Sequence, residues 1–83
     1  MVFLILSEQG FIEIQQVADK VHDKLWLNKG IVSDDTIAIA QQQQWQIRIF
    51  SEVIQSDSEN AIVKAIKYLE KKYPNEALEV EYL

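Results

Sequence analysis

The chain has 83 residues, no cysteine and a formal net charge of −5 at pH 7. The length predicts one domain, residues 1–83. The lack of thiols excludes a disulfide framework, a thiolate metal site and a cysteine nucleophile. The acidic balance disfavours general binding to nucleic acid or to an anionic membrane surface, because both require clustered Lys and Arg, and it permits a basic protein partner.

The first apolar segment, residues 2–6, contains no polar side chain. Such a short run is typical of a strand that is covered on both faces and therefore central in a sheet. No basic residue precedes it, and it is far shorter than a signal or membrane segment, so we expect a cytoplasmic protein. Gly10 then permits a tight turn.

Residues 11–25 carry apolar side chains at spacings of three and four, which predicts an amphipathic helix. Its apolar face would comprise Phe11, Ile14, Ala18, Val21 and Leu25. Gly30 is placed to end the helix. Residues 11–14 also alternate, so a hairpin with the first strand followed by a shorter helix is an open alternative.

The segment Thr36–Phe50 alternates on both sides of four glutamines. We interpret residues 36–40 and 45–50 as two strands joined by a polar turn, which makes them antiparallel neighbours. After it, Ser56 and Glu59 have the spacing of a capping box at the start of a second helix, which Pro74 ends. Its apolar face would comprise Ile62, Ala65, Ile66, Leu69 and Tyr73.

Residues 77–83 alternate again and predict a last strand. The element order is then strand, helix, strand, strand, helix, strand. This order predicts an α+β, ferredoxin-like split βαβ fold, with a four-stranded antiparallel sheet and two helices on one face. The first and third strands would be central, and the second and last would lie at the edges.

Three known families with the predicted architecture have motifs that can be compared with this sequence. The loop 7–10 has neither the cysteine pair of heavy-metal-associated domains nor the arginine of acylphosphatases. Gly10 before Phe11 resembles the glycine that opens the first helix of ACT domains. That resemblance, which rests on one residue, implies a small-molecule site near the first strand–helix loop. No family is assigned.

The titratable residues favour no catalytic or metal site. Asp19, His22 and Asp23 could supply metal ligands from one helical turn, but no second cluster completes the coordination, so a solvated helix face is preferred. Asp34 and Asp35 are best explained as turn and cap residues. We therefore predict a non-enzymatic protein without metal or cofactor.

The uncovered face of the predicted sheet is the candidate partner surface. It would combine a small apolar centre with a polar rim, as interaction patches do. Its residues are Ile5, Ala38, Ala40, Gln46, Arg48, Phe50, Glu79 and Glu81. We interpret the chain as a small acidic regulator or inhibitor that binds a protein, or itself as a homodimer, through this face. An ACT-like small-molecule sensor is the alternative.

Overall fold

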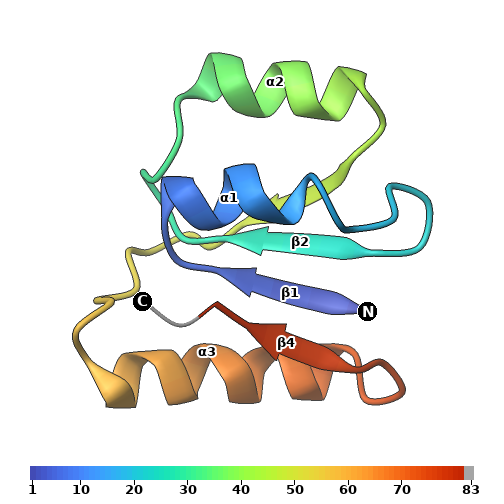
Figure 1. The fold of residues 1–83 in the computed structure, drawn as a ribbon. Helices are drawn as coiled ribbons and strands as arrows, with labels where there is room; N and C mark the ends of the chain where they lie inside the picture. The colour runs from blue at the N-terminus through green and yellow to red at the C-terminus, as the bar shows by residue number, and fades with distance from the viewer. Residues whose placement is uncertain (82–83) are drawn as a thin grey trace.

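The computed structural model describes residues 1–81, in which strands and helices alternate (Figure 1). The elements are β1 (Val2–Ile5), α1 (Glu8–Ile14), β2 (Lys24–Leu27), α2 (Asp34–Gln42), β3 (Gln46–Ile49), α3 (Glu59–Lys72) and β4 (Leu78–Val80). The expectation of an α+β chain with a four-stranded sheet is confirmed.

The predicted ferredoxin-like topology is wrong. The strands run in the order β3-β2-β1-β4, and all three neighbouring pairs are parallel. A helix separates each strand from the next along the chain, and such crossovers join parallel strands. The order is that of the first four strands of doubly wound sheets, in which helices cover both faces.

The second predicted strand, residues 36–40, is part of the helix α2. Ser33 caps this helix by accepting a hydrogen bond of 3.1 Å from the Thr36 N–H. Asp34 and Asp35 occupy its first turn, where negative charge suits the helix dipole. The isoleucines alternate with other residues, as they would in a strand, and this alternation concealed the helix. The residues between them are alanines, however, which are the best helix formers.

The helix predicted over residues 11–25 is also wrong in its second half. The helix α1 spans residues 8–14, which decides the open question of residues 11–14 in favour of helix. Residues 24–27 form β2 in the middle of the sheet, where Leu25, Trp26 and Leu27 are buried. By contrast, Val17 in the connecting segment is 79% exposed, so the apolar periodicity did not mark one buried face.

The other predictions fare better. The first segment forms β1, a central strand, and the last forms the edge strand β4, although residues 82–83 lie outside the described part. The apolar face of α3 is confirmed. Its N-cap is Ser58, which accepts a hydrogen bond from the Ala61 N–H, and not Ser56.

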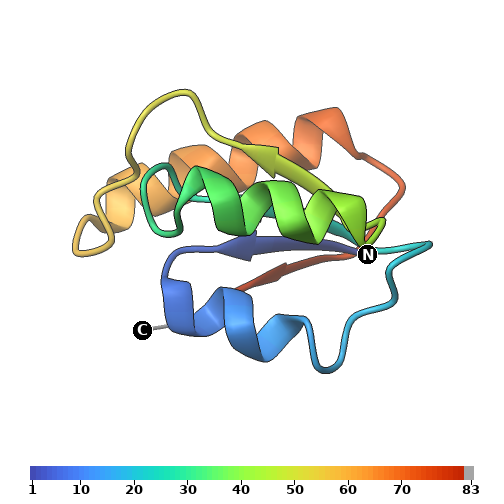
Figure 2. The same ribbon diagram turned by 90° about the horizontal axis from the view of Figure 1, so that it is seen from above.

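Two apolar clusters hold the sheet between helices (Figure 2). On one face, α1 and α2 pack against the sheet through a cluster that comprises Ile5, Phe11, Leu25, Leu27, Ala40, Trp45 and Ile47. On the other face, α3 packs on β1, β4 and one residue of β2, through Val2, Leu4, Leu6, Trp26, Ile54, Ala65 and Leu69. The first face thus has two helices and the second face has one.

Asn28, at the end of β2, fixes the segment between β3 and α3. Its side-chain amide donates to the Ile54 carbonyl at 2.9 Å, and its side-chain oxygen accepts from the Ile54 N–H at 2.8 Å. Both bonds are buried, and Asn28 is only 6% exposed. One side chain therefore satisfies both backbone groups of a residue that no sheet or helix pairs.

We predict that Asn28→Ala lowers the free energy of unfolding by about 2–4 kcal/mol, because two buried backbone groups lose their partners. Denaturant titration followed by circular dichroism measures the change. Asn75→Ala, in the exposed turn before β4, is the control and should change stability little. Equal stabilities for the two variants would contradict the role given to Asn28.

Candidate functional site

Within residues 1–81, helices lie on both faces of the sheet, so neither face is wholly open, and the predicted partner residues are not brought together. Ile5 is buried beneath the helices, and Ala40 is a buried residue of α2. Ala38 is exposed on α2 and belongs to no strand. The remaining predicted residues divide between the two ends of the sheet: Gln46, Arg48 and Phe50 on or after β3, and Glu79 and Glu81 on or after β4.

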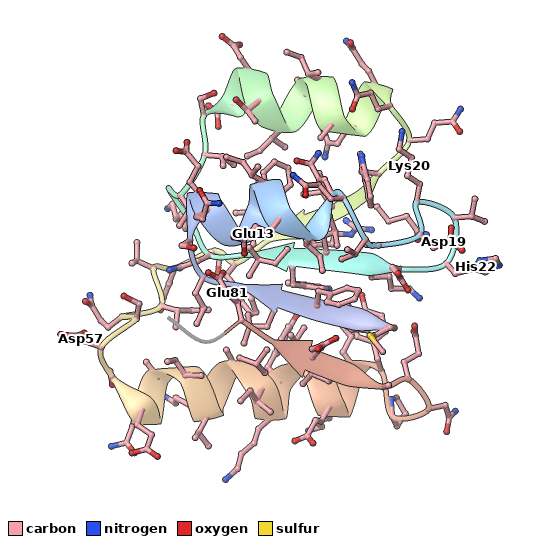
Figure 3. The ribbon with its side chains drawn as sticks, viewed as in Figure 1. Glu13, Asp19, Lys20, His22, Asp57 and Glu81 are labelled. Carbon is pink, nitrogen blue, oxygen red and sulfur yellow. The ribbon has the colours of Figure 1, made fainter. Side chains whose placement is uncertain are left out.

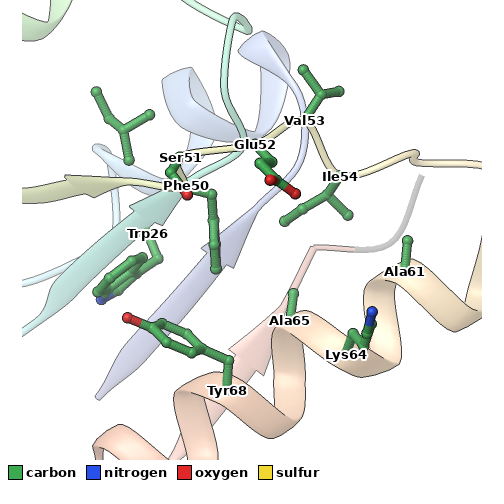
Figure 4. A pocket seen from close by; sticks show the side chains of 11 residues that line it. Trp26, Phe50, Ser51, Glu52, Val53, Ile54, Ala61, Lys64, Ala65 and Tyr68 are labelled. Carbon is green, nitrogen blue, oxygen red and sulfur yellow. The ribbon is translucent and has the colours of Figure 1, made fainter.

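A groove lies beside β3 on the face that α3 covers (Figure 4). It encloses about 570 Å³ between the end of β3, the segment that follows it and α3. We name it the aromatic groove, after Trp26, Phe50 and Tyr68. The remaining residues that line it are Ile49, Ser51, Glu52, Val53, Ile54, Ala61, Lys64 and Ala65.

The three aromatic rings of the groove contact one another. The ring centroid of Trp26 lies 5.0 Å from that of Phe50 and 5.7 Å from that of Tyr68, and the last two are 6.0 Å apart. Trp26 is almost wholly buried, whereas Tyr68 is 50% exposed. The groove therefore has a fixed aromatic floor and one wall that is open to solvent.

The groove exists because α3 covers only part of its face. The buried residues of α3 pack on β1, β4 and Trp26, and no side chain between Gln46 and Ile49 joins that cluster. Gln46 and Arg48 point toward this face, since they pair in register with Lys24 and Trp26, and both are exposed. Parallel sheets are normally covered on both faces, so this half of the sheet lacks a covering element.

Cations surround the aromatic groove. Lys64, Tyr68 and Lys72 follow one another at four-residue spacing and so share one side of α3. The Lys72 ammonium lies 5.9 Å from the Trp26 ring centroid, a cation–π distance. Within residues 1–81, no carboxylate forms an ion pair with Lys64, Lys72 or Arg48. Glu52 is the one acidic residue of the lining.

A second hollow of about 680 Å³ lies diagonally opposite, between α1 and the edge strand β4. Its apolar residues include Phe3, Ile14 and Val17, and its charged side chains are all acidic. They are Glu13, Asp23, Glu79 and Glu81. Large acidic content is unlike the core of protein interfaces, which are depleted in Asp and Glu and enriched in Trp, Tyr and Arg.

Doubly wound sheets bind ligands where the strand order reverses, and in this sheet that place is at the carboxyl ends of β1 and β4. Here Glu81 fills that position (Figure 3). Its carboxylate accepts hydrogen bonds from the Leu6 N–H at 2.7 Å, the Ser7 N–H at 3.0 Å and the Ser7 hydroxyl. A Cβ on Gly10 would overlap this carboxylate. The donors available to an anion are thus taken by the chain itself.

This arrangement also bears on the ACT resemblance. ACT domains imply a ferredoxin-like sheet, which this chain does not have, and the loop near Gly10 holds the Glu81 carboxylate instead of an open site. Gly10 is needed for close packing, because a Cβ at this position would overlap the Glu81 carboxylate. The residue on which the ACT resemblance depends therefore has a structural role in this fold.

The titratable cluster of residues 19–23 lies in an exposed turn and not on a helix (Figure 3). His22 Nδ1 and Asp19 Oδ2 are 2.7 Å apart. The hydrogen bond from the His22 side chain lowers the pKa of Asp19. In the described part of the chain, no group of three or more His, Cys, Asp or Glu residues is placed to hold a metal ion.

An ion pair near the aromatic rings joins β2 to the turn before β4. The Lys24 ammonium lies 2.8 Å from one Glu76 carboxylate oxygen and 5.4 Å from the Tyr73 ring centroid. Tyr73 in turn accepts a hydrogen bond of 3.1 Å from the Trp26 indole N–H. The hydrogen bond from Lys24 lowers the pKa of Glu76. This ion pair therefore helps to hold the ring that orients Trp26.

Comparison with protein-family models, with curated proteins and with solved structures gave no match for this chain. Among residues 1–81, no helix is long and apolar enough to cross a membrane.

Most of the aromatic groove could not be recognised from the sequence. No role was predicted for Tyr68, Val53 or Lys64. One signal was present: Lys64, Tyr68 and Lys72 form a stripe beside the apolar face of α3. The stripe indicates a binding surface only when the fold is known, because the fold places β3 opposite it.

We predict that Glu81→Ala lowers the free energy of unfolding by about 1–3 kcal/mol, because two backbone N–H groups lose a charged acceptor. Glu79→Ala is the matched control, since Glu79 is exposed on β4, two residues before Glu81, and its side chain makes no hydrogen bond within residues 1–81. Thermal and denaturant unfolding measure both variants. A loss as large in Glu79→Ala would show that the effect is one of net charge.

We further predict that Lys24→Met removes a pH-dependent part of the stability. A carboxyl group whose folded pKa is lowered adds stability above its unfolded pKa and loses that stability as the pH falls through the folded value. The stability difference between wild type and Lys24→Met should therefore be present at pH 7 and decline below about pH 4.5. A difference that stays constant down to pH 2 would contradict this linkage.

Proposed function

We propose that this protein is a non-enzymatic binding module, a small regulator or inhibitor that holds a segment of a partner protein in the aromatic groove. The observation that carries the proposal is the half-covered face of a parallel sheet, where Trp26, Phe50 and Tyr68 border a groove of about 570 Å³. Such a sheet is expected to be covered on both faces, so a partner would supply the missing cover. We place this binding in the cytoplasm.

Residue chemistry supports the same surface. Trp, Tyr and Arg supply most of the residues whose truncation weakens protein complexes. Trp26 and Tyr68 line this groove, and Arg48 is exposed beside it on β3, in register with Trp26. The exposed residues Ile49 and Val53 extend its apolar lining. The second hollow, between α1 and β4, has Phe3 as the one aromatic residue of its lining. Its Glu81 is already engaged with the backbone of residues 6 and 7.

A test of the groove needs a residue that contributes to binding and not to the fold. Phe50 packs against Trp26, so Phe50→Asp would damage the fold and would not report on binding alone. Tyr68 is a better probe because it is half exposed and contributes only the open wall of the groove. Val17 provides a matched control: it is an exposed apolar residue in a segment remote from the groove lining.

We predict that Tyr68→Ser loses a partner that wild type and Val17→Ser both retain from an extract of the source cells. With the purified partner, Tyr68→Ser should bind about thirtyfold more weakly, the effect of removing one central aromatic contact. Isothermal titration measures the affinity, and NMR shift changes on α3 and β3 locate the contact. Melting temperatures confirm that the variants are folded.

Full binding by a folded Tyr68→Ser variant, with shift changes elsewhere on the surface, would remove the aromatic groove as the binding site. A self-associating protein without a foreign partner would instead identify the alternative, a homodimer. Sedimentation of the purified chain separates these two outcomes.

A further inference from the structure

The aromatic groove also indicates what kind of segment fits it. We infer that the occupant is an acidic amphipathic helix of a partner protein, laid beside α3 over the end of β3. This inference rests on the proposed function and adds the conformation and the charge of the partner segment. Three features carry it: the width of the uncovered sheet, the cations at its border, with which no carboxylate of residues 1–81 forms an ion pair, and the poor fit of a second copy of this chain.

The width of the uncovered region matches one helix. Neighbouring strands are about 4.8 Å apart, so β3 and the adjoining side of β2 present a strip about 10 Å wide. A helix with its side chains is about 10–12 Å across, and packed helices lie about 8–10 Å apart. A helix next to α3 would complete the layer in the way that α1 and α2 complete the opposite face.

The length of the groove sets the spacing of the anchors. The residues of α3 that line it run from Ala61 to Tyr68 and extend about 10 Å along the helix axis, which corresponds to about two helical turns. Large apolar side chains at positions i, i+3 or i+4, and i+7 of the occupant would then face Trp26, Phe50 and Val53. This is the general pattern by which amphipathic helices bind hydrophobic grooves.

The charges of the groove select an acidic helix. Lys64 and Lys72 lie eight residues apart on α3, which is about 12 Å along the helix axis. Arg48 is exposed on the facing strand, and Glu52 is the single opposing carboxylate of the lining. A partner helix with acidic residues about two turns apart would pair with these cations, whereas a basic helix would place like charges together at a contact.

A second copy of the chain is a poor occupant. The exposed helices α1 and α2 are acidic, but α2 exposes only Ile39 among its large apolar residues and α1 only Ile12. Contact between a groove and a different surface of the next copy is heterologous and does not close into a dimer. Each copy also carries a net charge of −5, which opposes association.

The test is a selection from a display library of helical peptides in which every position is randomised. The full chain is the target, and the folded Tyr68→Ser variant is used for counter-selection, so that only binders of the groove are retained. The same selection is run on the double variant Arg48→Glu, Lys64→Glu. Its matched control is Lys20→Glu, Lys67→Glu, which has the same change in net charge and alters two exposed lysines outside the groove lining.

We expect the wild type to enrich peptides with apolar residues at helical spacing and Glu or Asp beside them. A purified peptide from that pool should bind the Arg48→Glu, Lys64→Glu variant at least about tenfold more weakly, because two attractions become repulsions, and the control variant nearly as well as wild type. Affinity for wild type should fall as salt is added. The peptide should gain helical circular dichroism on binding.

The inference fails in three ways that can be told apart. Peptides that depend on Tyr68 but show no acidic enrichment, or that bind as extended strands, would overturn the acidic helix and leave the groove as a binding site. Self-association that Tyr68→Ser abolishes would make a second copy the occupant. Selection of no peptide that depends on Tyr68 would overturn the inference and count against the proposed function as well.

Discussion

The structure depends on one constraint: a wholly parallel sheet must be covered on both faces. The central strand β1 is apolar on both sides, with Leu4 at 0% and Ile5 at 2% exposed. Two helices are available for the face of Ile5 and one for the face of Leu4. Because α3 covers β1 and β4 first, the side chains of β3 on that face remain exposed. The aromatic groove is a direct consequence of this unequal number of helices.

How much of the fold the sequence could predict depended on how distinctive each local pattern was. The uninterrupted apolar run of residues 2–6 has one good interpretation, and the apolar face of α3 is long enough to be unambiguous. Residues 24–27 were concealed because Leu25 also continues the helical spacing from Phe11. Residues 36–40 alternate like a strand, yet Ile39 is exposed and the cap at Ser33 decides the conformation. Burial, which the sequence does not show, decided the first of these segments, and the helix cap decided the second.

The candidate site was harder to predict because it is assembled from distant parts of the chain. Trp26 comes from β2, Phe50 follows β3 and Tyr68 belongs to α3. Only a correct topology brings the three rings together, and the predicted antiparallel sheet placed a free face elsewhere. Arg48 and Phe50 were nevertheless among the residues singled out, because their alternation with Ile47 and Ile49 assigned them to the face of the strand that the helices were not expected to cover.

Net charge is a poor guide to the partner that is proposed for this protein. The total of −5 favours a basic partner, but the carboxylates of the chain are distributed over all three helices, the turns and β4, while Arg48, Lys64 and Lys72 lie around the groove. Charges separated by more than about 8 Å are largely screened at physiological ionic strength. A segment that enters the groove is therefore governed by the cations that it touches, and the acidic remainder of the surface acts mainly at longer range and lower salt. The local field and the total charge favour opposite partners, and at contact the local field prevails.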